Sequence, residues 1–120
     1  MLRGIRGAST VEINEPEEIL DCVAELLKTI QVENKVNTED IGAVIFSSTP
    51  DLDSAFPAVA ARNLGWNEVP LFGTQEIDSP NGLKKCIRVL ILLNTNMSQQ
   101  EIKHIYLRGA TVLRKDIIEK

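Results

Sequence analysis

The sequence predicts an α+β fold in which a mixed β-sheet carries helices on one face. Strand-like and helix-like segments follow one another in the order β-α-β-α-β-β-α-β. A long amphipathic helix is indicated from about Pro16 to Val32, where apolar side chains recur at helical spacing. The run 86–93 is short, rich in branched side chains and apolar on both faces, which is typical of a buried strand.

The first half of the chain predicts two strands and two helices. Residues 2–13 alternate weakly and predict the first strand. Asn14 and Glu17 resemble a helix N-cap box, with Pro16 in the first turn, and Asn34 is a plausible end of that helix. The remaining elements are a turn at 38–40, a strand at 43–48, and a helix from Phe56-Pro57 to Leu64 that Gly65 ends.

The second half predicts mainly strands. Residues 69–72 form a short strand, and Pro70 indicates a sheet edge because proline cannot donate a ladder hydrogen bond. The other expected elements are a turn at 79–82, the strand 86–93, a short helix after the capping box Ser98–Glu101, strand-like segments at 104–107 and 110–113, and a flexible tail at 114–120.

Residues 1–120 are expected to form one domain that assembles into a homo-oligomer. The chain length suits a single domain of about 100–150 residues. In the strand 86–93, Leu90 and Leu92 lie on one face and Val89 and Ile91 on the other. The helices cover one face of the sheet, and no segment supplies a layer for the second face. We therefore expect sheets to pack against one another between subunits.

Composition excludes several classes of function. The 13 Lys and Arg and 17 Asp and Glu give a formal net charge of −4, which disfavours nucleic acid because phosphate contacts need a basic surface. The apolar runs are far shorter than the about 20 residues that span a bilayer, so no membrane partner is expected. The start of the chain lacks the apolar core of a signal peptide, and the two cysteines form no CxxC pair. A reduced, cytoplasmic protein is predicted.

Arg88 is the most informative residue, because it interrupts the most apolar run of the chain. A guanidinium stays protonated wherever it lies, and an unpaired buried charge is strongly unfavourable. No acidic residue lies within two positions, so its partner must come from elsewhere in the fold or from a ligand. Glu76 precedes the turn before this strand and is the nearest candidate partner. The pair could belong to a ligand site, or it could be an ion pair with a structural role only.

Further arginines and aromatic side chains suggest a pocket for a small carboxylate. Four residues each have an ordinary structural explanation: Arg6 and Arg62 as solvated side chains, Phe56 as a hydrophobic staple of the helix, and Tyr106 as a core or interface residue. Together with Glu76 and Arg88, however, they suggest an anion-binding site. The single histidine, His104, disfavours a histidine-based metal site or triad, and a structural or surface role is expected for it. No P-loop, GxGxxG or GxSxG motif is present.

Several motifs in order resemble the monofunctional, trimeric chorismate mutases of the AroH class, along nearly the whole chain. They are Arg3-Gly4-Ile5-Arg6-Gly7-Ala8, Thr10-Val11-Glu12, Thr49-Pro50-Asp51-Leu52, Phe56-Pro57-Ala58, Val69-Pro70, Gln75-Glu76, Lys84-Lys85-Cys86-Ile87-Arg88-Val89 and His104-Ile105-Tyr106-Leu107. The resemblance implies a homotrimer with sheets in its centre and active sites between subunits. It implies rearrangement of chorismate to prephenate, in phenylalanine and tyrosine synthesis, without metal, cofactor or covalent intermediate.

The resemblance also implies roles for individual residues. Arg88 would stabilise the negative charge that grows on the ether oxygen, Arg6 would bind a carboxylate, and Glu76 would accept a hydrogen bond from the ring hydroxyl. The remaining expected contacts are Tyr106 at a carboxylate, Phe56 (from the neighbouring subunit) and Leu113 as apolar walls, Arg62 and Arg114 closing over the substrate, and Gly73 and Thr74 in the pocket loop.

Two positions depart from the family pattern. Val59 stands where the family often has a lysine, and Gly73 stands where a cysteine is known. Both changes bear on affinity rather than on Arg6, Glu76 or Arg88. Two alternatives stay open: an imine/enamine deaminase of the same general architecture, which also uses an interfacial arginine, and a non-catalytic sensor of an aromatic-pathway metabolite.

Overall fold

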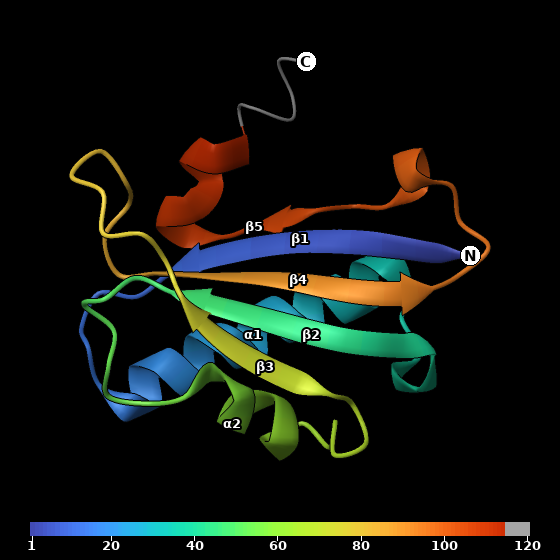
Figure 1. Cartoon of the computed structure of the whole chain (residues 1–120), viewed down its shortest axis with the longest axis horizontal. Coiled ribbons are helices and arrows are strands. Elements are labelled where there is room, and N and C mark those ends of the chain that lie inside the picture. The colour runs from blue at the N-terminus through green and yellow to red at the C-terminus, as the bar shows by residue number, and fades with distance from the viewer. Residues whose placement is uncertain (115–120) are drawn as a thin grey trace.

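Five strands form one mixed sheet in the computed structural model, which describes residues 1–114, with Arg114 described in its backbone only. The strands lie in the order β3-β2-β4-β1-β5 (Figure 1). β4 runs antiparallel to both of its neighbours, whereas β5 is parallel to β1 and β3 is parallel to β2. The strands are β1 (Leu2–Thr10), β2 (Ile41–Ser48), β3 (Leu71–Gln75), β4 (Cys86–Asn94) and β5 (Ile105–Tyr106).

Two helices, α1 (Pro16–Asn34) and α2 (Pro57–Asn63), lie on the same side of this sheet (Figure 1). The apolar stripe of α1 supplies the centre of the core, with six fully buried side chains: Ile19, Cys22, Val23, Leu26, Leu27 and Ile30. Gly7 allows the close approach of α1 to β1, because a Cβ there would lie 2.8 Å from the Ile30 Cδ1 atom. The predicted α+β class and the predicted position of the helices are confirmed.

Short 3₁₀ helices complete the chain: η1 (Thr38–Asp40), η2 (Gln99–Glu101) and η3 (Arg108–Arg114). The Ser98–Glu101 capping box is present, although the helix it begins is only this single turn. The strand expected at 110–113 is wrong, because η3 occupies those residues. Arg108 adopts a left-handed φ of 51° and turns the chain off the sheet, and the Gly109 N–H then donates to Thr10 Oγ1 at 2.9 Å.

Helix α1 begins one residue later than its capping pattern predicts. Its N-cap is Glu15. The Asn14 side chain instead bonds to the loop that precedes α2: its Nδ2 donates to Asp53 Oδ1 at 2.8 Å, and its Oδ1 accepts from the N–H of Ser54 at 3.3 Å. Asn34 is the last helical residue, as expected, and Lys35 follows it in the left-handed conformation. The edge position of β3, indicated by Pro70, is confirmed.

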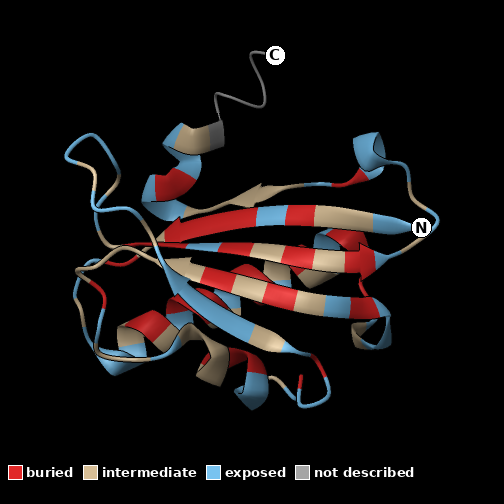
Figure 2. Ribbon diagram, viewed as in Figure 1, coloured by how far each residue is buried: buried red, intermediate tan, exposed pale blue. Residues whose placement is uncertain are grey.

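Within residues 1–114, the second face of the sheet carries no α-helix, as Figures 1 and 2 show for the side turned to the viewer. Along β4, Val89 and Ile91 are buried against the helices, while Leu90 and Leu92 on the other side are only half-buried. Phe72 on β3 is 64% exposed. We call this surface the open face. Among the residues described, no helix is long and apolar enough to cross a membrane.

Candidate active site

Arg88 lies on the open face and forms an ion pair with Glu76. The Arg88 Nε atom is 3.3 Å from the Glu76 Oε1 atom, and the two side chains are 46% and 29% exposed. The prediction that Arg88 is buried is wrong for the single subunit, because strand alternation directs it away from the helices. The prediction that an acidic partner comes from elsewhere in the fold is confirmed by Glu76. Glu76 directly follows β3, and its backbone N–H donates to Ser48 O at 2.8 Å.

The strand register brings further predicted residues into one row across the open face. From β3 to β5 the neighbours are Thr74, Ser47, Arg88, Ala8 and Tyr106. Arg6 lies opposite Leu90, in the adjacent row. It is therefore a diagonal neighbour of Arg88, and such neighbours have Cα atoms about 7–8 Å apart. Two arginines that start from neighbouring positions of one surface form a positive centre on an otherwise acidic protein.

A hollow of about 250 Å³ lies around this centre, lined by Arg6, Gly7, Ala8, Ile45, Ser47, Arg88, Val89, Leu90 and Tyr106. Three of the predicted site residues, Arg6, Arg88 and Tyr106, thus share one hollow. Ser47 and Ile45 also line it and were not predicted, although the alternation of residues 43–48 would have placed them on the same face as Arg88. Ligand pockets usually enclose about 300–1,000 Å³, so this hollow needs a further wall to surround a ligand.

Leu113 and η3 border the same end of the open face. Leu113 packs, with Tyr106 and Leu83, on a small buried cluster of Ala8, Cys86 and Ala110. The predicted apolar role of Leu113 therefore has a geometric basis beside Tyr106. The side chain of Arg114 and the tail 115–120 lie outside the described residues, so the closing role expected of Arg114 and the expected flexibility of the tail stay predictions.

Phe56, Gly73 and Thr74 line a second hollow, of about 650 Å³, at the edge formed by β3 and the start of α2. Phe56 is 81% exposed, which is unusual for a phenylalanine without a partner. A Cβ at Gly73 would contact nothing within 4 Å, so the glycine leaves this edge open. Arg62 is exposed in the last turn of α2 and lines neither of the two hollows.

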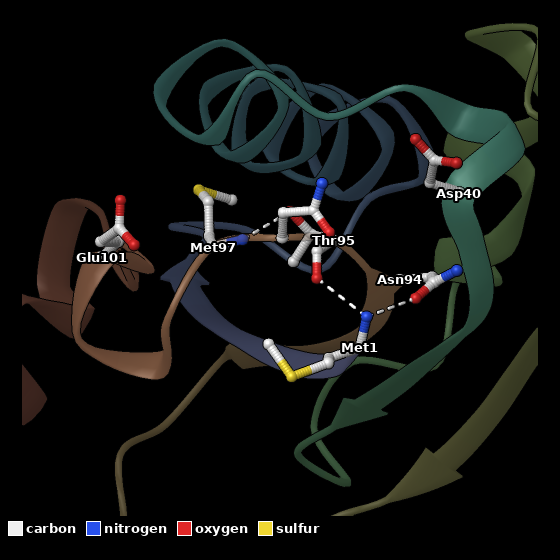
Figure 3. A pocket seen from close by; sticks show the side chains of 7 residues that line it. Met1, Asp40, Asn94, Thr95, Met97 and Glu101 are labelled. Carbon is white, nitrogen blue, oxygen red and sulfur yellow. Dashed lines mark hydrogen bonds between the residues drawn. The ribbon is translucent and has the colours of Figure 1, made fainter.

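A third hollow, of about 630 Å³, is unsuited to an anion. It lies where β1 begins and β4 ends, and its lining includes the carboxylates of Asp40 and Glu101 but no arginine (Figure 3). The N-terminal ammonium group points into it and donates to Asn94 Oδ1 at 2.9 Å and to Thr95 O at 3.0 Å. Carboxylates repel an anionic ligand, which leaves the Arg88 hollow as the better candidate.

His104 supports the strand that carries Arg6. Its Nδ1 atom accepts a hydrogen bond from the Arg6 backbone N–H at 2.9 Å, one residue before β5 begins. Burial and then the nearby Arg6 guanidinium lower the pKa of His104 below its ordinary value, which favours the neutral ring that this bond requires. The expected structural role is confirmed by this bond. Among residues 1–114, no three His, Cys, Asp or Glu side chains gather as a metal site.

The fold and this hollow define a small α+β protein with Arg6, Arg88 and Tyr106 around one hollow of its open face. The family model described as Chorismate mutase type I matches residues 2–117. Chorismate mutase AroH of Bacillus subtilis (strain 168) is 48% identical over 118 residues, covering 98% of this chain and 93% of its own. Chorismate mutase AroH of Thermus thermophilus is also 48% identical, covering 98% and 97%.

A solved structure agrees with these sequence matches. The chorismate mutase from Clostridium thermocellum superposes with a TM-score of 0.89 and 48% identity, over 91% of this chain and 97% of that one. The chain belongs to the type I chorismate mutase family. The resemblance that the motifs indicate is confirmed.

Proposed function

We propose that this chorismate mutase rearranges chorismate to prephenate at the hollow around Arg88. The observation that carries the proposal is the Arg88–Glu76 pair beside Arg6 and Tyr106 on the open face. The reaction is intramolecular: the ether C–O bond breaks while a C–C bond forms, and no atom is gained or lost. The product enters phenylalanine and tyrosine synthesis.

Arg88 is proposed to act on the ether oxygen. Negative charge grows on that oxygen in the transition state, so a fixed guanidinium there stabilises the transition state more than the substrate. The side chain starts from β4, which is bonded on both sides by β1 and β2. A rigid strand holds the donor in place before the reaction begins, so little reorganisation is needed during it.

Glu76 and Arg6 are proposed to hold the two halves of the substrate. Glu76 accepts a hydrogen bond from the ring hydroxyl and lies where positive charge gathers on the ring. Arg6 binds a carboxylate and keeps the enolpyruvyl arm over the ring, with Tyr106 at a carboxylate beside it. Holding both ends near the reactive geometry removes much of the entropic part of the barrier.

A homotrimer is proposed to complete the site. The Arg88 hollow is open, the open face carries the apolar side chains of Leu90, Leu92 and Phe72, and Phe56 projects from the opposite edge of the same chain. In a closed ring of subunits, the Phe56 edge of one copy meets the Arg88 hollow of the next. Phe56 and Leu113 then form apolar walls, Thr74 and Gly73 border the entrance, and Arg62 and Arg114 close it.

We also propose that the protein works in the cytoplasm as a single domain, without nucleic acid. The net charge of −4 supports the absence of a phosphate-binding surface. Cys22 and Cys86 are free and buried, in keeping with a reducing compartment.

The test is to mix the pure protein with chorismate and follow the loss of its ultraviolet absorption. The proposal predicts acceleration over buffer, with prephenate as the product. No acceleration contradicts it. Hydrolysis of 2-aminoacrylate without chorismate turnover would instead favour a deaminase, and tight chorismate binding without turnover would indicate a sensor.

A further inference from the structure

We propose that Asp51 is a positioning residue for the Arg88–Glu76 pair. It acts through the segment 76–85, called here the β3–β4 loop, whose two ends carry Glu76 and the start of β4. The inference rests on the proposed function for the roles of Arg88 and Glu76. The motif Thr49-Pro50-Asp51-Leu52 has no place in the mechanism so far, and this assignment gives it one.

Both ends of the β3–β4 loop are fastened to one short turn, residues 48–51. At the first end, the Glu76 N–H donates to Ser48 O at 2.8 Å. At the second end, Thr49 bonds to Cys86 in both directions: the Thr49 N–H donates to Cys86 O at 3.0 Å, and the Cys86 N–H donates to Thr49 Oγ1 at 3.0 Å. The turn therefore sets the separation of the two ends of the loop.

Asp51 is the centre of this attachment. Its carboxylate accepts the Lys85 N–H through both oxygens, at 2.9 and 3.2 Å, and it also accepts the hydroxyl of Thr49. Asp51 thereby orients the same Thr49 oxygen that receives the N–H of Cys86. Burial raises the pKa of the Asp51 carboxyl, but these hydrogen bonds outweigh it and hold the pKa below its ordinary value. The group is ionised at neutral pH and accepts at both oxygens.

The backbone at Lys85 shows why such an anchor is needed. Lys85 has a φ of 47°, a left-handed conformation that a residue with a side chain rarely adopts. Conformations of this kind persist where the surrounding structure determines them from several sides. Besides Asp51, the Val11 N–H donates to Lys85 O at 2.9 Å, and the Lys85 Nζ atom donates to Glu12 O at 3.1 Å.

Lys85 immediately precedes β4 and lies three positions before Arg88 in the sequence. Loss of the Asp51 anchor frees Lys85 to leave the left-handed conformation, which moves the beginning of β4 relative to Glu76. A displacement of 1 Å at a reacting group can lower turnover by about 10²-fold. The expected defect is a loss of turnover rather than of substrate affinity, because the carboxylate contacts of Arg6 and Tyr106 come from β1 and β5.

The first experiment compares chorismate kinetics in Asp51→Ala, Asp51→Asn and a matched control, Glu101→Ala. The Glu101 carboxylate also accepts a backbone N–H, from Ser98 at 2.8 Å, but it lies in η2 at the other end of the sheet (Figure 1). Each of the two alanine variants removes one negative charge and one carboxylate that accepts a backbone N–H. We expect Asp51→Ala to lower kcat by at least about 10-fold with KM within about 3-fold, and Glu101→Ala to stay within about 2-fold in both.

The second experiment measures how accessible Cys86, at the start of β4, is to a thiol reagent, and it does not depend on turnover. The Cys86 thiol is 1% exposed, and burial raises its pKa to about 11, so it should react slowly with a thiol reagent. In a Cys22→Ser background, Cys86 is the only thiol in the chain. We expect its reaction rate in the native protein to rise at least about 10-fold with Asp51→Ala and to stay unchanged with Glu101→Ala.

The outcomes separate the two claims. Normal kcat in Asp51→Ala, or a lowered kcat with an unchanged Cys86 rate, overturns the positioning role. Equal effects of Asp51→Ala and Glu101→Ala overturn it as well, since they show only lost stability. If Asp51→Ala does not fold, Asp51→Asn decides, because it retains one acceptor for Lys85 and should lower kcat and raise the Cys86 rate by at least about 3-fold. A wild-type protein without chorismate turnover rejects the proposed function, while the thiol rates still test the anchor.

Discussion

Arg88→Ala should separate catalysis from stability. The Arg88–Glu76 pair lies on the open face, with the Arg88 side chain 46% exposed. Exposed ion pairs contribute about 0–1 kcal/mol, and Glu76 stays partly hydrated after the change, so the free energy of unfolding should fall by at most about 1 kcal/mol. Removal of a donor to a developing oxyanion lowers turnover by about 10²–10³-fold, which corresponds to about 2.7–4 kcal/mol.

The assay follows the ultraviolet absorption of chorismate at saturating substrate, beside thermal melts recorded by circular dichroism. Arg88→Lys keeps the charge but loses the planar fork of the guanidinium, and it should also be poor. Glu76→Gln removes the same ion pair while leaving the donor to the ether oxygen, so its thermal melt is the matched control for stability, whereas its turnover tests the separate role proposed for Glu76. Near-normal turnover in Arg88→Ala or Arg88→Lys would refute the role assigned to Arg88.

Three further changes test the fold and the site. Gly7→Ala would place a Cβ 2.8 Å from Ile30 Cδ1 and 3.0 Å from Val89 Cγ1; such overpacking should reduce the free energy of unfolding by about 1–3 kcal/mol in urea titrations, and an unchanged midpoint would contradict the packing of α1 on β1. Leu90→Arg puts a charge in the middle of the open face, so light scattering should report a smaller assembly with little turnover, and an intact trimer would contradict the proposed interface. His104 has a lowered pKa and binds the Arg6 N–H as the neutral ring, so the stability it contributes is present above its ordinary value of 6.5 and is lost as the pH falls through the lowered pKa. His104→Asn keeps an acceptor and should remove this acid-dependent loss from urea titrations, whereas His104→Leu should lower stability at neutral pH as well; the same acid-dependent loss in His104→Asn would contradict the reasoning.

Local patterns predicted the sheet and its covered face well. The alternation of residues 86–93 and the helical spacing of residues 19–30 decide which side chains face each other, and both depend on near neighbours in the sequence. Pro70 indicated the edge strand because the missing N–H limits where proline can lie in a sheet. The motifs around Arg6, Glu76 and Arg88 identified the family, and Glu76, the candidate partner of Arg88, does form the ion pair.

Predictions from the sequence failed where contacts between distant residues decide the structure. Residues 110–113 have strand-like composition, but the left-handed turn at Arg108 and the bond from Gly109 to Thr10 direct them into η3. Arg88 sits in an apolar run, yet it is exposed because no segment within residues 1–114 covers it on that face. The role of Asp51 needs its long-range bond to Lys85, which no spacing in the sequence reveals.

The central claim is that a site forms from the Arg88 hollow of one subunit and the Phe56 edge of the next. Mixing subunits tests it most directly. Arg88→Ala and Phe56→Asp should each be inactive alone, because one loses the donor and the other places a carboxylate beside an anionic substrate. After the two variants are unfolded and refolded together in equal amounts, random trimers contain both intact halves in about a quarter of their sites. We predict recovery of about a quarter of wild-type chorismate turnover; a mixture that stays inactive although mixed trimers have formed would contradict a site shared between subunits.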